Sequence, residues 1–122
     1  MKSISYLLLS ILWTSTVALA AEQWGLERGR PDLESAGALT FGPDDVLFIG
    51  DTKSAAIFAI ATGDTGGDSS NADINVTGLR AALSDVCGAE ATINDLAANP
   101  RTGTVFVSVM AGDAPAICQI DG

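Results

Sequence analysis

The feature that most constrains this chain is an internal repeat of short apolar segments separated by turn residues. The two copies span 38–63 and 95–122. A repeated unit of this kind buries its apolar faces only by packing on its neighbour, so the repeat decides the fold before any other feature. The corresponding positions are Leu39 and Leu96, Pro43 and Pro100, 47–49 and 105–107, Ile57 and Ile117, and Ile60 and Ile120.

The first copy predicts three short strands. We expect them at 39–41, 46–49 and 56–60, with a Gly-Pro-Asp-Asp turn after the first one. The segment 73–77 then alternates polar and apolar residues, which indicates a half-exposed fourth strand.

The second copy predicts the same strands but stops earlier. A strand at 93–98 and a turn at 101–103 lead into a strand with Val105, Val107 and Val109 on one face. Four antiparallel strands per repeated unit are typical of a propeller blade. We therefore expect an all-β fold of about two blades of an incomplete β-propeller, with an ordinary β-sandwich as the alternative.

Residues 78–87 change to a helical period, with apolar side chains on one face and Gly88 as the stop. Thr77 is the expected N-cap. The resulting organisation is a signal peptide at 1–20, an irregular lead-in at 21–35, a first blade at 36–77, a helical connector at 78–91 and an incomplete second blade at 92–122.

The first twenty residues predict export. Lys2 is followed by an uncharged run, and Ala18-Leu19-Ala20 has the small-x-small form of a cleavage site. The alternative is an uncleaved membrane anchor, but the polar run 14–16 dilutes the apolar stretch that a membrane span needs. We expect a periplasmic or secreted protein with no membrane association after cleavage.

Composition excludes several classes of function. The chain has 15 acidic and 6 basic residues and a net charge of -9, which disfavours nucleic acid and anionic membranes as partners. It has no histidine, so histidine-based catalytic triads and metal sites cannot be built from this chain.

The stretch F-G-P-D-D-V-L-F-I-G-D-T-K-S-A-A-I-F-A-I at 41–60 resembles a blade of the NHL-type and gluconolactonase/regucalcin-like propellers, whose blades often run V-D-P-D-G-N-L-Y-V-A-D-T-x-N-x-R-I. The resemblance implies a six-bladed propeller, and it implies that Asp51 braces its turn by accepting hydrogen bonds. Propellers host enzymes, scaffolds and binding modules alike, so the blade pattern does not select among them.

The lactonase branch of that family is similar to E-G-P-x-W-x-P in its first strand, where the glutamate is a metal ligand. With Phe41 at the aromatic position, the glutamate belongs at position 37, which is Gly37. The nearest acid, Glu34, lies three residues earlier. The metal-site glutamate is therefore not reproduced.

The candidate ligand residues are Asn94, Asp95 and Glu34. Asn94 and Asp95 lie near the start of a predicted innermost strand, which in propellers edges the central channel, and their oxygens suit calcium. The alternative is that Asp95 accepts backbone hydrogen bonds at the strand entry. The oxygen-rich loop 64–73 does not fit an EF-hand and indicates a solvated loop.

Cys87 and Cys118 are the only cysteines. Export favours a disulfide between them, whereas their apolar surroundings favour two buried thiols. No catalytic residue is identified.

The sequence leaves three functions open. The first is an exported binding or scaffold module that recognises a small molecule, glycan or protein, as the N-terminal part of a longer propeller whose remaining blades are its partners. The second is a calcium-dependent lactonase-type hydrolase. The third is a small stand-alone structural domain.

Overall fold

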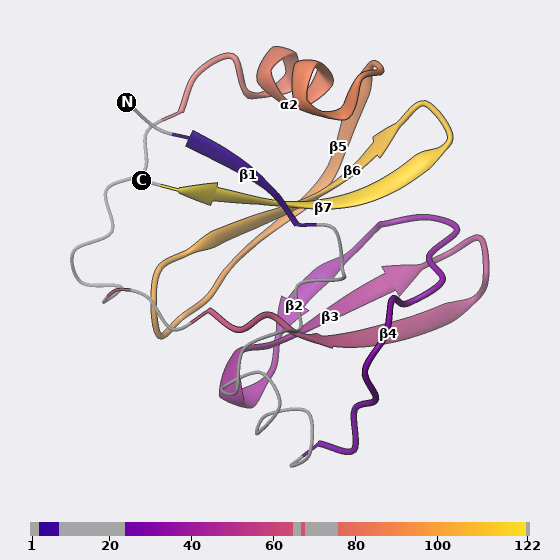
Figure 1. Cartoon of the computed structure of the whole chain (residues 1–122), viewed down its shortest axis with the longest axis vertical. Helices are drawn as coiled ribbons and strands as arrows, with labels where there is room; N and C mark the ends of the chain where they lie inside the picture. The colour runs from indigo at the N-terminus through magenta and orange to yellow at the C-terminus, as the bar shows by residue number, and fades with distance from the viewer. Residues whose placement is uncertain (1–2, 8–23, 65–66, 68–75, 122) are drawn as a thin grey trace.

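The computed structural model describes residues 3–7, 24–64, 67 and 76–121, which form two antiparallel sheets and one α-helix (Figure 1). This confirms a predominantly β fold. The described residues contain no closed sheet, so propeller blades stay a prediction. The first sheet has the order β2 (Leu39–Phe41), β3 (Val46–Asp51), β4 (Ala56–Ala61), and the second has the order β1 (Ser3–Leu7), β7 (Ala114–Asp121), β6 (Val105–Ala111), β5 (Ala91–Ala98).

The three strands predicted for the first copy are all present, with β3 and β4 slightly longer than expected. A single 3-10 turn, Pro43–Asp45, joins β2 to β3. Asp44 and Asp45 both adopt left-handed backbone angles, with φ of 57° and 62°. Aspartate tolerates this region better than most residues, which explains why the turn carries two of them.

The meander β5-β6-β7 has the same cross-strand register as β2-β3-β4. Eight of the nine pairs of facing residues in the first meander have a counterpart at the corresponding positions of the second, and the exception is Val46·Ala61. The matched pairs include Leu39·Ile49 with Leu96·Val107, Leu47·Ile60 with Val105·Ile120, Gly50·Ile57 with Ser108·Ile117, and Asp51·Ala56 with Val109·Ala116.

The main core lies between the two sheets. Phe106 and Ile117 of the second sheet pack against the apolar face of the first, which consists of Leu39, Leu47, Ile49 and Ile60. Phe41 meets Phe106 edge-on across this interface, with ring centroids 5.5 Å apart and an interplanar angle of 61°.

A second core covers the other face of the second sheet. Val105, Val107 and Val109 share that face, as predicted, and pack against Leu83 of the helix α2 (Leu79–Cys87). The second sheet is therefore covered on both faces, by the first sheet and by α2 (Figure 1).

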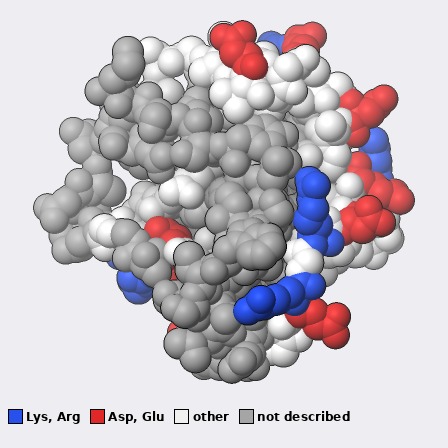
Figure 2. Space-filling view, in the orientation of Figure 1, with Lys and Arg blue, Asp and Glu red and all other residues white. Residues whose placement is uncertain are grey.

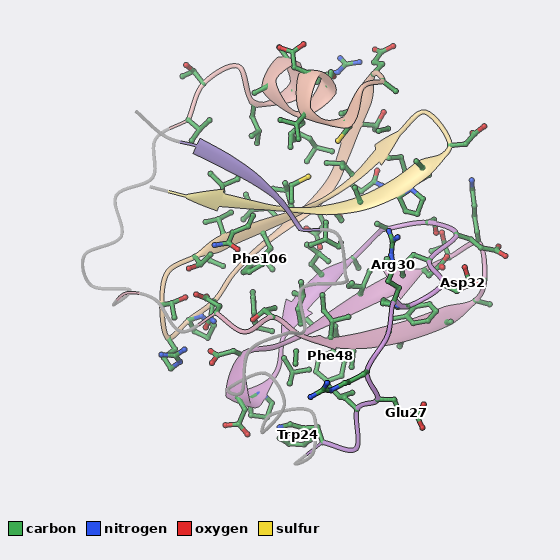
Figure 3. The ribbon with its side chains drawn as sticks, in the orientation of Figure 1. Trp24, Glu27, Arg30, Asp32, Phe48 and Phe106 are labelled. Carbon is green, nitrogen blue, oxygen red and sulfur yellow. The ribbon has the colours of Figure 1, made fainter. Side chains whose placement is uncertain are left out.

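The two meanders stack head to tail, which means that they contact each other through non-equivalent faces. The first contributes the face of Leu47 and Ile49, whereas the second contributes the opposite face, that of Phe106. The residue of the first sheet that corresponds to Phe106 is Phe48. Figure 3 shows Phe106 in the space between the sheets and Phe48 on the first sheet, away from that space.

Helix α2 begins at Leu79, one residue later than predicted, and its N-cap lies one residue after Thr77. Gly78, with φ of 67°, is the N-cap and makes no side-chain cap bond, so the prediction of Thr77 as the cap was wrong. The left-handed conformation at residue 78 suits glycine and moves the helix start past Thr77. Gly88, with φ of 74°, ends the helix as predicted.

Part of the predicted signal peptide forms a strand. β1 pairs antiparallel with β7, from Ser3 opposite Asp121 to Leu7 opposite Ile117, and gives the second sheet its fourth strand. The cleavage site predicted at 18–20 lies outside the described residues, as does most of the fourth strand predicted at 73–77. The signal peptide stays a prediction.

Candidate functional site

Three polar side chains of the second sheet bind the backbone of residues 36–39, and we call this set the inter-sheet seam. Asn94 Nδ2 donates to the Ala36 carbonyl at 2.6 Å, and Ser108 Oγ donates to the Gly37 carbonyl at 2.6 Å. The Leu39 amide donates to Asp95 Oδ2 at 2.8 Å. The seam satisfies the Leu39 amide, at the start of β2, and two carbonyls of the segment just before β2, which has a neighbouring strand on one side only.

The seam uses both candidate ligands predicted at 94–95. A β-bulge between Ile93 and Asp95 breaks the ladder and gives these side chains their direction. Asp95 Oδ1 accepts a further bond from the Leu96 amide at 2.8 Å. Hydrogen bonds from the Leu39 and Leu96 amides lower the pKa of Asp95 from its ordinary value, so the carboxylate is held ionised.

Glu34, the third candidate, has an exposed side chain, and only its backbone joins a described network. The Glu34 amide donates to Asp51 Oδ2 at 2.8 Å, and Ser35 donates to Asp51 Oδ1 through both its amide and its hydroxyl. The amides of Lys53 and Ser54 also donate to Asp51 Oδ1. Asp51 thus ties the lead-in to the β3–β4 turn.

Asp51 is 1% exposed. Burial raises the pKa of Asp51, but the hydrogen bonds from Ser35, the Glu34 amide and Ser54 outweigh that effect and hold the pKa well below its usual range. The carboxylate is therefore a structural anion that braces the turn.

Gly37 occupies the position where the lactonase pattern has its glutamate. A Cβ at residue 37 would lie 3.1 Å from the Gly50 carbonyl oxygen, so this backbone approach leaves little room for a side chain. Among the described residues, no three acidic or cysteine side chains gather into a group that could hold a metal ion. The observed role of the seam is to connect the second sheet to the backbone of residues 36–39.

A second polar cluster, which we call the hairpin latch, joins the β5–β6 turn to the first sheet. It consists of Asp45, Asp64, Asn99, Arg101 and Thr102. Arg101 donates two hydrogen bonds to the Asp45 carboxylate, from Nε to Oδ1 at 3.0 Å and from Nη2 to Oδ2 at 2.8 Å. Asn99, 2% exposed, donates to Asp45 at 2.8 Å and to Asp64 at 3.0 Å.

The sequence pattern predicts separate turns at Asp45 and at Arg101, and strand periodicity does not indicate that the two turns are in contact. The signal that could have found the latch is the match of Pro43 with Pro100, because equivalent turns of stacked units lie next to each other. An acidic turn beside a basic one then predicts an ion pair.

The outer face of the first sheet carries Ile57, the most exposed large apolar side chain among the described residues. We define it by Phe48, Gly50, Ile57 and Ala59, the counterparts of the buried face of the second sheet. Ile57 is 77% exposed, whereas its counterpart Ile117 is fully buried.

A groove of about 220 Å³ lies beside this face, between the lead-in and β4. Its floor is Ala59, Ile60 and Ala61, and its rim is the lead-in segment 26–31. The charged residues of the rim are Glu27, Arg28 and Arg30, and neither arginine has an ion pair within the described residues. Figure 2 shows the wider charge pattern, with acidic side chains along the right-hand margin of the visible face.

Comparison with family models, with curated proteins and with solved structures gives no match. Within the ranges that the structure describes, no helix has the length and apolar character needed to cross a lipid bilayer.

Proposed function

We propose that this chain is an exported binding or scaffold module built of propeller-type meanders that stack head to tail. We further propose that it binds its partner through the outer face of its first sheet. The partner has an acidic group next to an apolar surface. The observation that carries the proposal is the contrast between Ile57, 77% exposed, and its buried counterpart Ile117.

Head-to-tail stacking supports this proposal, because it is an open-ended arrangement. A head-to-tail contact uses two different faces, so the first unit keeps free the face that the second unit has buried. The outer face carries the half-buried Phe48 and the exposed Ile57, the same residue types in the same register as Phe106 and Ile117. An exposed apolar surface with a polar rim is typical of an interaction site.

The groove adds the electrostatic part of the proposal. In a chain of net charge -9, the rim has two basic side chains without ion pairs among the described residues and one acidic side chain, Glu27. The other described arginines are engaged, Arg80 with Glu90 and Arg101 with Asp45. A carboxylate reaching the rim would gain the partner that Arg28 and Arg30 lack.

The testing experiment is a titration of the ¹⁵N-labelled chain with decanoate, a probe that joins an apolar chain to a carboxylate. We expect amide shifts in residues 26–31 and 57–61. The double variant Arg28→Gln/Arg30→Gln should weaken these shifts, because it removes both rim cations.

The matched control is Arg80→Gln/Lys53→Gln, which removes two positive charges outside the groove and should leave the titration unchanged. Equal weakening by both double variants, or shifts confined to residues other than these two segments, would contradict the proposal.

A further inference from the structure

Cys87 and Cys118 belong to facing elements that pack on one another. Cys87 is the last residue of α2, and Cys118 lies in β7 on the sheet face that α2 covers. Both side chains pack in the same apolar cluster, and the Cys87 thiol lies close enough to Cys118 to help raise the pKa of its thiol. Both are free thiols in this structure.

The two thiols differ in access to solvent. Cys87 is partly exposed, whereas Cys118 is fully buried. Burial, together with the neighbouring Cys87 thiol, raises the pKa of Cys118 to about 12. A dissolved oxidant can therefore reach Cys87 first, and Cys118 reacts only with a sulfur atom that is already beside it.

We propose that Cys87 and Cys118 form a disulfide that locks α2 onto the second sheet, with Cys87 as the entry thiol and Cys118 as the resolving thiol. The oxidant is a small soluble disulfide such as glutathione disulfide. The inference draws on the proposed export only for the oxidising compartment, and it involves neither the groove nor the outer face.

The reaction balances in two exchange steps. The Cys87 sulfur attacks glutathione disulfide, which forms a mixed disulfide and releases one glutathione thiolate. The Cys118 sulfur then attacks the Cys87 sulfur, forms the intramolecular bond and releases the second glutathione. The protons lost by the two cysteines end on the two glutathione thiols, and two electrons pass from the protein to the oxidant.

The lock matters because α2 is weakly fixed by its own structure. It has nine residues and no side-chain N-cap bond, and Leu83 is its buried residue. Isolated helices of this length are marginal in water, so its position depends on packing and on a few contacts such as the Ala91 amide bond to Ser84 Oγ at 2.9 Å.

The disulfide would also determine how often α2 uncovers the face of the second sheet on which it packs. The sheet face under α2 contains Val105 and Val107, the counterparts of Leu47 and Ile49, on which the second sheet stacks. An oxidised chain keeps this face closed, whereas a reduced chain lets α2 leave it more often.

The experiment treats the folded, purified chain with glutathione disulfide and maps the products by non-reducing mass spectrometry. We expect an intramolecular link between Cys87 and Cys118, reversed by dithiothreitol. The oxidised chain should unfold at a midpoint roughly 10 °C higher, because the link closes a loop of about 30 residues. Amide exchange in α2 should slow about tenfold.

Single variants test the order of the two steps. Cys118→Ala should stop at glutathione bound to Cys87, whereas Cys87→Ala should leave Cys118 unmodified until the chain unfolds. Circular dichroism checks the fold of each variant. Absence of the intramolecular link in the oxidised wild-type chain would overturn the proposal, as would equally fast modification of the two variants.

Discussion

The two meanders share one strand register and differ in what covers them. The second is enclosed by the first sheet on one face and by α2 on the other. The first packs against a sheet on one face only, and its outer face leaves Ile57 exposed. Strand pattern therefore sets the local structure of each unit, whereas the position in the stack sets which of its apolar residues are buried.

Substitution of the equivalent residues Ile117 and Ile57 should give the largest difference in unfolding free energy between the two meanders. Ile117→Ala leaves a cavity in the main core and should cost about 3 kcal/mol of unfolding free energy, whereas Ile57→Ala removes an exposed side chain and should cost about 0.5 kcal/mol or less. Urea unfolding of both variants measures the two costs. Similar costs would mean that the two faces are covered alike.

Asp51 and its counterpart Val109 should make the stability of the two meanders depend differently on pH. Asp51 has a lowered pKa, so its contribution to stability is full above the ordinary value of 3.8 and is lost as the pH falls from there toward the lowered pKa. The counterpart, Val109, has no titratable group and is fully buried.

We expect Asp51→Asn to lower the stability near neutral pH and to flatten its decline in acid relative to the wild type. Urea midpoints measured from about pH 7 down to about pH 2.5 test this expectation. Parallel pH profiles of the wild type and the variant would show that Asp51 titrates normally in the folded chain.

The inter-sheet seam gives a smaller effect. Ser108→Ala leaves the Gly37 carbonyl without its donor and should cost about 1 to 2 kcal/mol. The counterpart, Gly50, has a backbone that accepts a Cβ, whose nearest neighbours would lie 3.7 Å away, so Gly50→Ala should change stability by about 0.5 kcal/mol or less. Chemical denaturation measures both, and a neutral Ser108→Ala would argue against the seam.

The turns between the second and third strands of the two meanders should give the smallest effect. Ala55 adopts φ of 54° in the first, where the second has Gly112 at φ of 61°. Ala55→Gly should stabilise the chain by about 0.5 to 1 kcal/mol, and Gly112→Ala should destabilise it by a similar amount. Thermal midpoints measure both, and changes of the same sign would contradict the assigned backbone angles.

Much of the fold could be predicted from local pattern. The apolar run at 46–49, the turn at Pro43 and the valines of β6 fix strands and faces through short-range periodicity. The position of α2 follows from its apolar spacing, although Gly78 displaced the expected cap.

The polar contacts between units could not be predicted in the same way. The sequence predicts Asn94 and Asp95 as candidate ligands, whereas in the structure both side chains bind the backbone of the distant segment 36–39. The pairing of Asp45 with Arg101 also depends on how the sheets stack. Such contacts are set by tertiary structure, which strand periodicity does not encode.

The most direct test of head-to-tail stacking is methyl NMR of the isoleucines with a soluble paramagnetic agent. We predict that the Ile117 methyl signals stay sharp and show NOEs to Leu47 or Ile60, whereas the Ile57 signals broaden strongly. Equal protection of Ile57 and Ile117, or an Ile117 without NOEs to the first sheet, would contradict the stacking on which the proposed function rests.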